Sequence, residues 1–283
     1  MYPVFPSTYD RGISPYPPPA CETSTVNSEE RRRQIASLTA VHGRVTVVEL
    51  ADRFDVTPET IRRDLTVLDD EGALHRVHGG AVPTNTFQTR ETAIEERRGA
   101  APEAKVRIGR AAATLLPETG TVFLDAGTTT AMLAHSIAED PTKGRNLTFI
   151  TNCLPIAVRL GAAGISDVQL LGGHIRAITQ AVVGDITLRA IGINHADIAF
   201  IGTNALSLDH GLSTADAREA AVKRAMIANA DRVVTMCDST KFGRDYLVSF
   251  APVSEVDAVV TDTGIPAQYL EALEREEIDV LRA

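Results

Sequence analysis

The stretch 46–80 constrains the fold of this chain more than any other part of the sequence. Thr46 followed three residues later by Glu49 is the pattern of a capping box, which predicts the start of a helix. Thr57 then predicts a second N-cap, and Pro58 takes the first helical position, where its missing N–H is not needed. These signals predict two short helices joined by a turn.

The second of these helices presents a polar face. Ile61, Leu65 and Leu68 repeat at helical spacing and predict a buried stripe, and Gly72 predicts the end of the helix. Hydroxyl-bearing and guanidinium side chains point away from that stripe. A helix N-terminus attracts phosphate, and arginine binds guanine through two hydrogen bonds, so this face suits the major groove of DNA.

A glycine-centred hairpin follows the second helix. Segments 73–78 and 81–83 flank Gly79-Gly80, a dipeptide that tolerates the positive φ of a tight turn. His75, Arg76 and His78 predict a wing lying along the duplex. Paired arginines alone would favour a plain helical hairpin, but the two caps, the turn and the wing together favour a winged helix-turn-helix. The predicted DNA-contacting residues are Thr57, Thr60, Arg62, Arg63, Thr66, Arg76 and His78.

The segment Ser28–Pro83 resembles the winged helix-turn-helix of the DeoR family of bacterial transcriptional regulators. The resemblance is carried by RRRQIASL, VTVVELADRF, VTPETIRRDL and EGALHRVHGGAVP. TIRRDL followed by an HGG hairpin is a highly specific combination. The resemblance implies a transcriptional regulator that binds operator DNA.

The charge of the chain indicates that DNA binding depends on a local positive face. The net charge is −9, and residues 28–83 carry eight basic against ten acidic side chains, 8 − 10 = −2. The arginines are grouped at 31–33, 62–63 and 76, whereas residues 69–71 are acidic. We therefore expect modest non-specific affinity that falls steeply with salt.

The chain divides into four predicted segments. Residues 1–27 contain six of the fourteen prolines and no periodic apolar pattern, which predicts a disordered tail. A proline-rich ligand and a true translation start at Val26 are the alternatives for this tail. Residues 28–83 form the DNA-binding domain, with Ser28 as the first cap. Residues 84–102 form a polar linker, partly helical around 91–98, and residues 103–283 form a sensor domain.

Residues 103–283 alternate between helical and β-rich stretches, so the predicted fold class is α/β. Such alternation implies a parallel sheet covered on both faces, with ligands beyond the carboxyl ends of its strands. Strands are predicted at 121–125, 147–151, 168–171, 197–201, 232–237, 257–261 and 278–281. Helices are predicted at 103–116, 128–138, 154–162, 185–193, 215–230 and 266–276.

Small and polar residues follow four of the predicted strands. After the first strand, Asp125 and Gly127 precede three threonines at a helix N-terminus, which suits phosphate but equally suits simple helix caps. The next three strands end in Thr151-Asn152, Gly172-Gly173 and Gly202-Thr203-Asn204. Lys223 and Lys241 can supply cations, although each alone is typical of a solvated surface lysine. Together these residues favour an anion site.

The same region resembles the sensor domain of the DeoR family, in the order LDAGTTT, ITN, LLGG, VVGD, IGTN and CDSTKFG. The resemblance implies a fold similar to sugar-phosphate isomerases, a phosphorylated sugar as effector, and repression of a sugar-uptake or catabolic operon. It departs from the family at 181–183, Ala-Val-Val, where a small hydroxyl residue is usual. The implied effector-binding residues are Asp125, Gly127, Thr128, Thr129, Asn152, Gly172, Gly173, Lys223 and Lys241.

Two functions compete. The overall likeness is to actinobacterial fructose-operon repressors, which makes fructose 1-phosphate the leading effector and a homo-oligomer the expected assembly. The rival is an aldose-ketose phosphate isomerase with an attached DNA module. It needs a general base, for which Asp125, Asp216 and Glu219 are available, but nothing in their spacing indicates that they converge. No catalytic residue is therefore predicted.

Other classes of site find little support. Cys21, Cys153 and Cys237 lie far apart without a CxxC pair, and the histidines at 135, 174, 195 and 210 lack metal-ligand spacing. No charge-free apolar run of membrane-spanning length occurs. We expect a cytoplasmic protein with neither metal nor cofactor.

Overall fold

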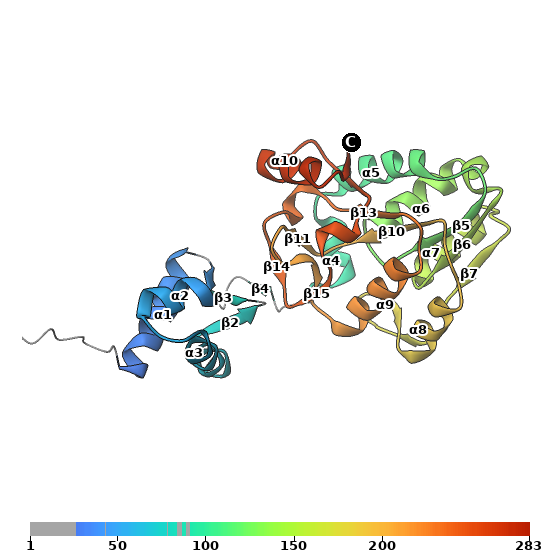
Figure 1. Cartoon of the computed structure of the whole chain (residues 1–283). Helices are drawn as coiled ribbons and strands as arrows, with labels where there is room; N and C mark the ends of the chain where they lie inside the picture. The colour runs from blue at the N-terminus through green and yellow to red at the C-terminus, as the bar shows by residue number, and fades with distance from the viewer. Residues whose placement is uncertain (1–26, 43, 78, 84–86, 89–90) are drawn as a thin grey trace, which may run out of the picture. The chain divides into compact units, whose positions relative to one another are not determined.

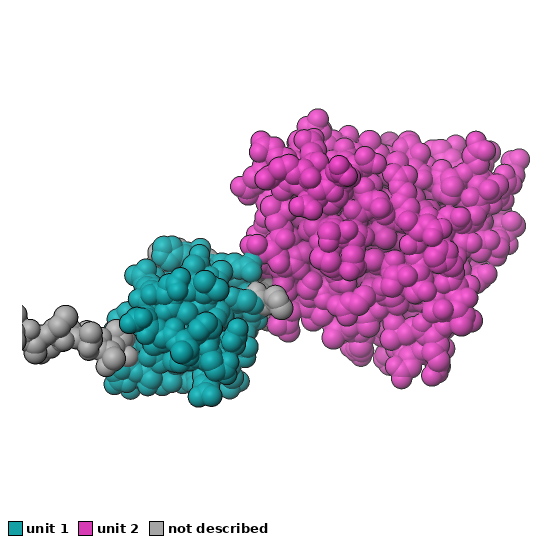
Figure 2. All heavy atoms as spheres, viewed as in Figure 1, with its two compact units in different colours: residues 1–82 teal, residues 83–283 magenta. Residues whose placement is uncertain are grey.

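The computed structural model describes residues 27–42, 44–77, 79–83, 87–88 and 91–283. The predicted tail up to residue 26 and the predicted contact His78 lie outside the described residues. The chain forms two compact units, residues 1–82 and 83–283 (Figure 2). The helix-turn-helix lies in the first unit, and the α/β domain lies in the second.

The first unit packs three helices on a small sheet. Five of its apolar side chains, Ile35, Leu50, Ile61, Leu65 and Leu74, are at most 2% exposed. The sheet has the strand order β1-β3-β2, and β1 pairs with β3 antiparallel. The elements are α1 (Ser28–His42), β1 (Val45–Thr46), α2 (Val47–Phe54), α3 (Pro58–Asp70), β2 (Leu74–Val77) and β3 (Gly80–Pro83).

The predicted caps of α2 and α3 form. Thr46 Oγ1 accepts from the N–H of Glu49 at 3.2 Å, and Glu49 Oε2 accepts from the N–H of Thr46 at 3.0 Å. Hydrogen bonds from Thr46 lower the pKa of Glu49. Thr57 Oγ1 accepts from the N–H of Thr60 at 3.3 Å. At the end of α3, Gly72 has φ +70° and its N–H donates to Asp69 O at 2.9 Å, as a C′ glycine does.

The start of α1 corrects one prediction. Asn27, not Ser28, is the cap: its Oδ1 accepts from the N–H of Glu29 at 3.3 Å and from the hydroxyl of Ser28 at 3.4 Å. Asparagine caps a helix as well as serine does, so the helix begins one residue earlier than the serine indicated.

The two glycines of the wing serve different purposes. Gly79 has φ +78°, as the predicted turn requires. Gly80 is needed for close approach, because a Cβ there would lie 2.0 Å from the carbonyl oxygen of Val45 in β1. The hairpin prediction was therefore right, with the positive φ confined to Gly79 of the pair.

The second unit is built on a seven-stranded parallel sheet of order β17-β16-β13-β10-β5-β6-β7. Its strands are the seven that the sequence predicted. Their bounds are β5 (Gly120–Leu124), β6 (Leu147–Thr151), β7 (Val168–Leu170), β10 (Ile198–Gly202), β13 (Val233–Met236), β16 (Ala258–Thr261) and β17 (Asp279–Arg282).

Helices cover both faces of this sheet. Figure 1 shows α5 and α6 together on one side and α8 and α9 together on the other. The helices are α4 (Ile94–Gly99), α5 (Pro102–Ala112), α6 (Thr130–Glu139), α7 (Leu154–Ala162), α8 (Asp185–Gly192), α9 (Ala217–Ala228) and α10 (Ala267–Arg275). The 3₁₀ turns are η1 (Ala113–Leu115), η2 (Pro141–Gly144), η3 (Ser239–Lys241) and η4 (Val253–Glu255).

Several short strands were not predicted. A three-stranded antiparallel sheet has the order β11-β12-β15, β8 pairs with β9, and β14 pairs with β4. Each spans two to four residues, too few for a periodic apolar pattern. Their bounds are β4 (Phe87–Gln88), β8 (His174–Ile175), β9 (Val182–Val183), β11 (Ala205–Ser207), β12 (Gly211–Thr214), β14 (Asp245–Tyr246) and β15 (Val248–Ala251).

The strand order fixes where a ligand is expected. From β5 the chain moves outward to β6 and β7, whereas from β10 it moves the other way to β13, β16 and β17. The loops after β5 and β10 therefore diverge and leave a crevice at the carboxyl end of the sheet. In the part of the chain that the structure describes, no helix has the length and apolar character needed to cross a membrane.

Candidate DNA-binding face and effector cleft

The exposed face of α3 carries two arginines. The Arg62 side chain is 56% exposed and that of Arg63 is 81% exposed. Glu59 lies 3.4 Å from Arg62 Nη1 and 3.8 Å from Arg63 Nε, one turn before them. Exposed pairs of this kind are weak, so both guanidinium groups are free to exchange Glu59 for a nucleic acid.

The predicted threonine contacts are already used within the protein. The hydroxyls of Thr57 and Thr60 lie 2.9 Å apart at the cap of α3. Thr66 donates to Arg62 O at 2.8 Å and accepts from Arg76 Nη1 at 2.8 Å. Thr66 therefore braces the wing against α3. A groove of about 620 Å³ lies along this brace, lined by Val47, Val48, Pro58, Arg62, Leu65, Arg76, Val77, Gly79 and Gly80.

The grouping of Arg31 with the positive face was wrong. Arg31 is 9% exposed, and its Nε lies 2.6 Å from Oδ2 of Asp64, a residue of α3 that is 4% exposed. Arg32 Nη1 approaches Asp64 Oδ1 at 3.8 Å. Asp64 falls three residues after Ile61, on the predicted buried stripe, and that spacing was the available signal of a buried carboxylate.

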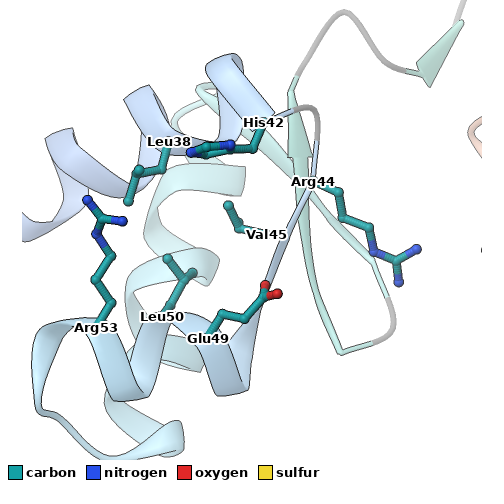
Figure 3. Close-up of a pocket in the computed structure, with 7 residues that line it drawn as sticks. All are labelled: Leu38, His42, Arg44, Val45, Glu49, Leu50 and Arg53. Atoms are coloured by element: carbon teal, nitrogen blue, oxygen red, sulfur yellow. The ribbon is translucent and has the colours of Figure 1, made fainter.

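A second hollow of about 340 Å³ lies between α1 and α2 (Figure 3). Figure 3 shows the side chain of Arg44 directed away from it. No predicted DNA contact lines this hollow, since its residues are Leu38, His42, Arg44, Val45, Glu49, Leu50 and Arg53.

In the second unit, a polar cleft opens at the carboxyl ends of β5 and β10. It combines the loop after β5, the end of β10, two side chains of α9, one of η3 and one of α4. Its lining is Arg97, Ala126, Gly127, Thr128, Thr129, Gly202, Thr203, Asn204, Glu219, Lys223 and Lys241. Five of the predicted effector residues are therefore brought together: Gly127, Thr128, Thr129, Lys223 and Lys241.

Asp125 is not part of the lining and lies beneath it. It is 1% exposed and accepts from Thr130 Oγ1 at 2.6 Å and from the N–H groups of Gly127 at 3.1 Å and Gly202 at 2.9 Å. Lys223 Nζ also contacts Asp125 and donates to Gly202 O at 2.8 Å. Asp125 therefore fixes the loop after β5, the end of β10 and Lys223 in one arrangement.

Asn152, Gly172 and Gly173 also lie outside the lining. Asn152 Nδ2 donates to the carbonyl oxygen of Val182 in β9 at 3.0 Å. Gly172 O accepts from the Thr187 hydroxyl at 2.8 Å, and a Cβ on Gly173 would lie 2.2 Å from that hydroxyl. These three residues shape the loops beside β9 and α8. They follow strands further from the crevice, which spacing along the sequence does not reveal.

Sequence reasoning missed Arg97 and assigned Glu219 only to the enzyme alternative. Arg97 Nη1 donates to Asn204 Oδ1 at 3.1 Å, whereas its Nε and Nη2 are buried and find no hydrogen-bond partner within the described ranges. Glu219 accepts from Arg176 Nη1 at 2.5 Å and from the Thr179 hydroxyl. Arg97 lies in a stretch of mixed charge without an apolar stripe, so no pattern marked it.

Three buried titratable groups lie beside the sheet. Burial lowers the pKa of Lys105 to about 8, and its Nζ lies 4.0 Å from Asp238 Oδ2. Burial raises the pKa of Cys153 to about 11 and also raises the pKa of Cys237, so both thiols are unreactive. Among the residues that the structure describes, no three His, Cys, Asp or Glu side chains gather as metal ligands.

Two family models match this chain. The DeoR-like helix-turn-helix domain matches residues 31–87, and the DeoR C terminal sensor domain matches residues 100–263. With the structure, they confirm the predicted fold class of a helix-turn-helix followed by a larger α/β domain.

Curated relatives match over most of their length. HTH-type transcriptional regulator GlpR of Haloferax volcanii is 35% identical over 252 residues, 89% of this chain and 96% of the relative. The glycerol-3-phosphate regulon repressor of Escherichia coli K12 is 34% identical, and the match covers 86% of this chain and 94% of the relative. The lactose phosphotransferase system repressor of Streptococcus mutans is 35% identical, with 84% and 93% covered. A ribose 5-phosphate isomerase from Plasmodium falciparum superposes with a TM-score of 0.37 at 15% identity, covering 50% of this chain and 54% of that one.

Proposed function

The chain belongs to the DeoR family of transcriptional regulators, and we propose that it represses a sugar-uptake or catabolic operon and leaves its operator when a phosphorylated sugar binds the cleft. The DNA-binding half of this proposal is supported by the helix-turn-helix family match and by the two exposed arginines of α3. The effector half depends on the chemistry of the cleft.

The cleft is the observation that carries the effector. Thr128 and Thr129 stand at the N-terminal side of α6, where backbone N–H groups and hydroxyls favour an anion. Lys223, Lys241 and Arg97 line the same cleft, which gives it three cations against the single carboxylate of Glu219. A phosphate group satisfies the cations, and Glu219 and Asn204 suit the hydroxyls of a sugar.

Fructose 1-phosphate is the proposed effector. Its support is the resemblance of RRRQIASL, VTPETIRRDL and RVHGGAVP to actinobacterial fructose-operon repressors. The names of the curated relatives refer to glycerol 3-phosphate and to lactose uptake, so we propose the class, a small phosphorylated polyol or sugar, ahead of the compound.

The proposal includes a homo-oligomer. One winged helix with a charge of −2 offers few cations to DNA, and two copies on repeated half-sites double the base contacts. Effector binding then favours an assembly whose helices no longer match the operator spacing, which requires different effector affinities in the two states.

The isomerase alternative is disfavoured by the relatives, which are named as regulators or repressors. The carboxylates available to it are also occupied. Asp125 contacts Lys223, and Glu219 is bound by Arg176 and Thr179. Burial tends to raise the pKa of Asp216, but hydrogen bonds from Arg218 and from the N–H of Glu219 lower it overall. A carboxylate with a lowered pKa is a poor general base at neutral pH.

Fluorescence anisotropy tests the proposal. The full-length protein is titrated onto labelled DNA from upstream of its own gene at fixed moderate salt, with and without fructose 1-phosphate, glucose 6-phosphate, glycerol 3-phosphate and unphosphorylated fructose. We expect specific binding that one phosphorylated compound reverses and that fructose leaves unchanged. Specific binding indifferent to every compound would refute the effector half, and absence of specific binding would refute the repressor.

A further inference from the structure

The segment Glu91–Ala100, in the C-terminal part of the predicted linker, is fastened to the rest of the second unit beside the cleft. Arg176 binds Glu91 through two hydrogen bonds, Nη1 to Oε1 and Nη2 to Oε2, each 2.6 Å long. Ile94 is 4% exposed, and its N–H donates to Ile178 O at 3.0 Å. Burial tends to lower the pKa of Arg176, but its hydrogen bonds and ion pairs with Glu91 and Glu219 raise it overall. These contacts fix the N-terminal half of the segment.

The C-terminal half of the segment is fixed by a buried lysine. Lys105 Nζ donates to the carbonyl oxygen of Arg97 at 2.5 Å and to that of Ala100. These are carbonyls at the carboxyl end of α4, which has no further turn to bond them. The segment is thus held at both ends within the second unit.

Two contacts of the segment lead directly to residues that line the cleft. Arg176 binds Glu219 as well as Glu91, and Asn204 binds Arg97. Both Glu219 and Asn204 line the cleft. A ligand that moves either residue therefore acts directly on the segment.

Two features of the cleft point to a change on ligand binding. Its free space is about 20 Å³, whereas ligand pockets usually hold about 300 Å³ or more. Arg97 also brings two buried nitrogens without a partner in the described chain, an arrangement that costs free energy. A guanidinium fork in such a place matches the oxygens of a phosphate.

We propose that the segment Glu91–Ala100 is a movable wall of the cleft, that Arg97 binds the phosphate of the effector, and that the Glu91–Arg176 ion pair is the catch that fastens this wall to the loop between β8 and β9. The inference rests on the proposed function and adds its regulation. Only residues 84–86 separate Pro83, the end of the wing strand β3, from Phe87 in β4. The wall, which begins at Glu91, therefore follows the DNA-binding unit closely along the chain.

The phosphate contact is tested by calorimetry on the full-length protein with fructose 1-phosphate, glucose 6-phosphate and glycerol 3-phosphate. Arg97→Ala is expected to weaken the binding seen with wild type about 10- to 100-fold, the usual range for a charged hydrogen-bonded contact. Arg97→Lys should recover part of that loss, and Arg98→Ala, a neighbouring exposed arginine, should change nothing. Thermal unfolding of each variant separates loss of binding from loss of fold.

The catch is tested with Glu91→Gln, which keeps the shape of the side chain and removes its charge. Calorimetric affinity should stay within about 3-fold of wild type, whereas the effector should lose at least half of its effect on operator affinity, because coupling is a free-energy difference between states. Glu95→Gln, exposed on α4, is the matched control.

The outcomes distinguish failure of the proposed function from failure of this inference. Wild type that binds none of the three compounds would remove the effector half of the proposed function and this inference with it. Wild type that binds one of them, with Arg97→Ala binding equally well or Glu91→Gln responding fully, would overturn the inference alone.

Discussion

Arg31 and Asp64 form an ion pair inside the DNA-binding unit, with Nε 2.6 Å from Oδ2 and the two side chains 11% and 6% exposed. The pair joins α1 to α3, the helix that carries the proposed DNA contacts. Asp64 is the residue directly after Arg62-Arg63, so the same turn of helix holds an inward acid and two outward cations. The orientation of the arginines therefore depends on this carboxylate.

Removing the acid should destabilise the unit. Asp64→Ala removes the carboxylate that pairs with the buried Arg31, and losing one member of a buried pair costs roughly 3–5 kcal/mol. We expect the urea midpoint of the first transition to fall accordingly. Arg31→Met with Asp64→Leu should recover most of the loss, since well-packed apolar residues replace such pairs with little cost. A single Asp64→Ala variant as stable as wild type would contradict the structural role.

The two exposed arginines should control operator affinity without controlling the fold. Arg62→Ala and Arg63→Ala are each expected to weaken specific binding by about 1–3 kcal/mol, roughly 5- to 150-fold, if they read base edges. Anisotropy against operator and scrambled DNA measures this, with Arg275→Ala on α10 as the control. Full operator affinity in both variants would remove α3 from the interface.

The wing should not tolerate a side chain at its inner glycine. Gly80→Ala places a Cβ 2.0 Å from Val45 O, which forces β3 away from β1 and separates Arg76 from Thr66. We expect lower stability and weaker operator binding together. Gly161→Ala, where nothing lies within 4 Å of the new carbon, should leave both unchanged. Equal behaviour of the two variants would show that the approach of β3 to β1 is adjustable.

Lys241 should contribute to effector binding through charge. Lys241→Met keeps much of the side chain and removes a cation from the cleft lining, so affinity for a phosphorylated sugar should fall about 10-fold or more. Lys143→Met, a half-exposed lysine beside Asp140, is the matched control. Calorimetry at two salt concentrations checks the assignment, because the loss should shrink as salt screens the lysine.

Lys105 should give the second unit a pH-dependent stability. Its pKa in the folded protein is about 8, below the ordinary value of 10.5, so between these values the unfolded chain binds more protons. Stability from this lysine therefore rises as pH increases from about 8 towards 10.5 and is lost as pH falls through about 8. Urea unfolding is measured for wild type and Lys105→Met at pH 7.5, 8.5 and 9.5. The free energy of unfolding of wild type should rise relative to that of the variant as the pH increases. A difference in unfolding free energy between the two proteins that stays constant across that pH range would contradict the shifted pKa of Lys105.

The sequence by itself determined the local elements. The caps at Thr46 and Thr57 and the φ of Gly72 and Gly79 depend on contacts within a few residues, and these can be read without a fold. The seven parallel strands were also predictable, because each is a short run rich in apolar and β-branched residues. The four phrases in the DNA-binding unit that resemble the DeoR family, together with those in the sensor, gave the family.

Only the tertiary structure decided which side chains meet. Thr128 and Lys241 share a cleft because β5 and β13, which precede them, both lie beside β10, and no local pattern states that order of strands. Asp125 was predicted to bind the effector, but in the structure it accepts from four donor groups and holds the loops beneath the cleft in place. Arg97 was unmarked because a linker with mixed charges has no period, and its position depends on Asn204 more than one hundred residues away. Local structure follows from neighbouring residues, whereas a binding site depends on the packing of distant ones.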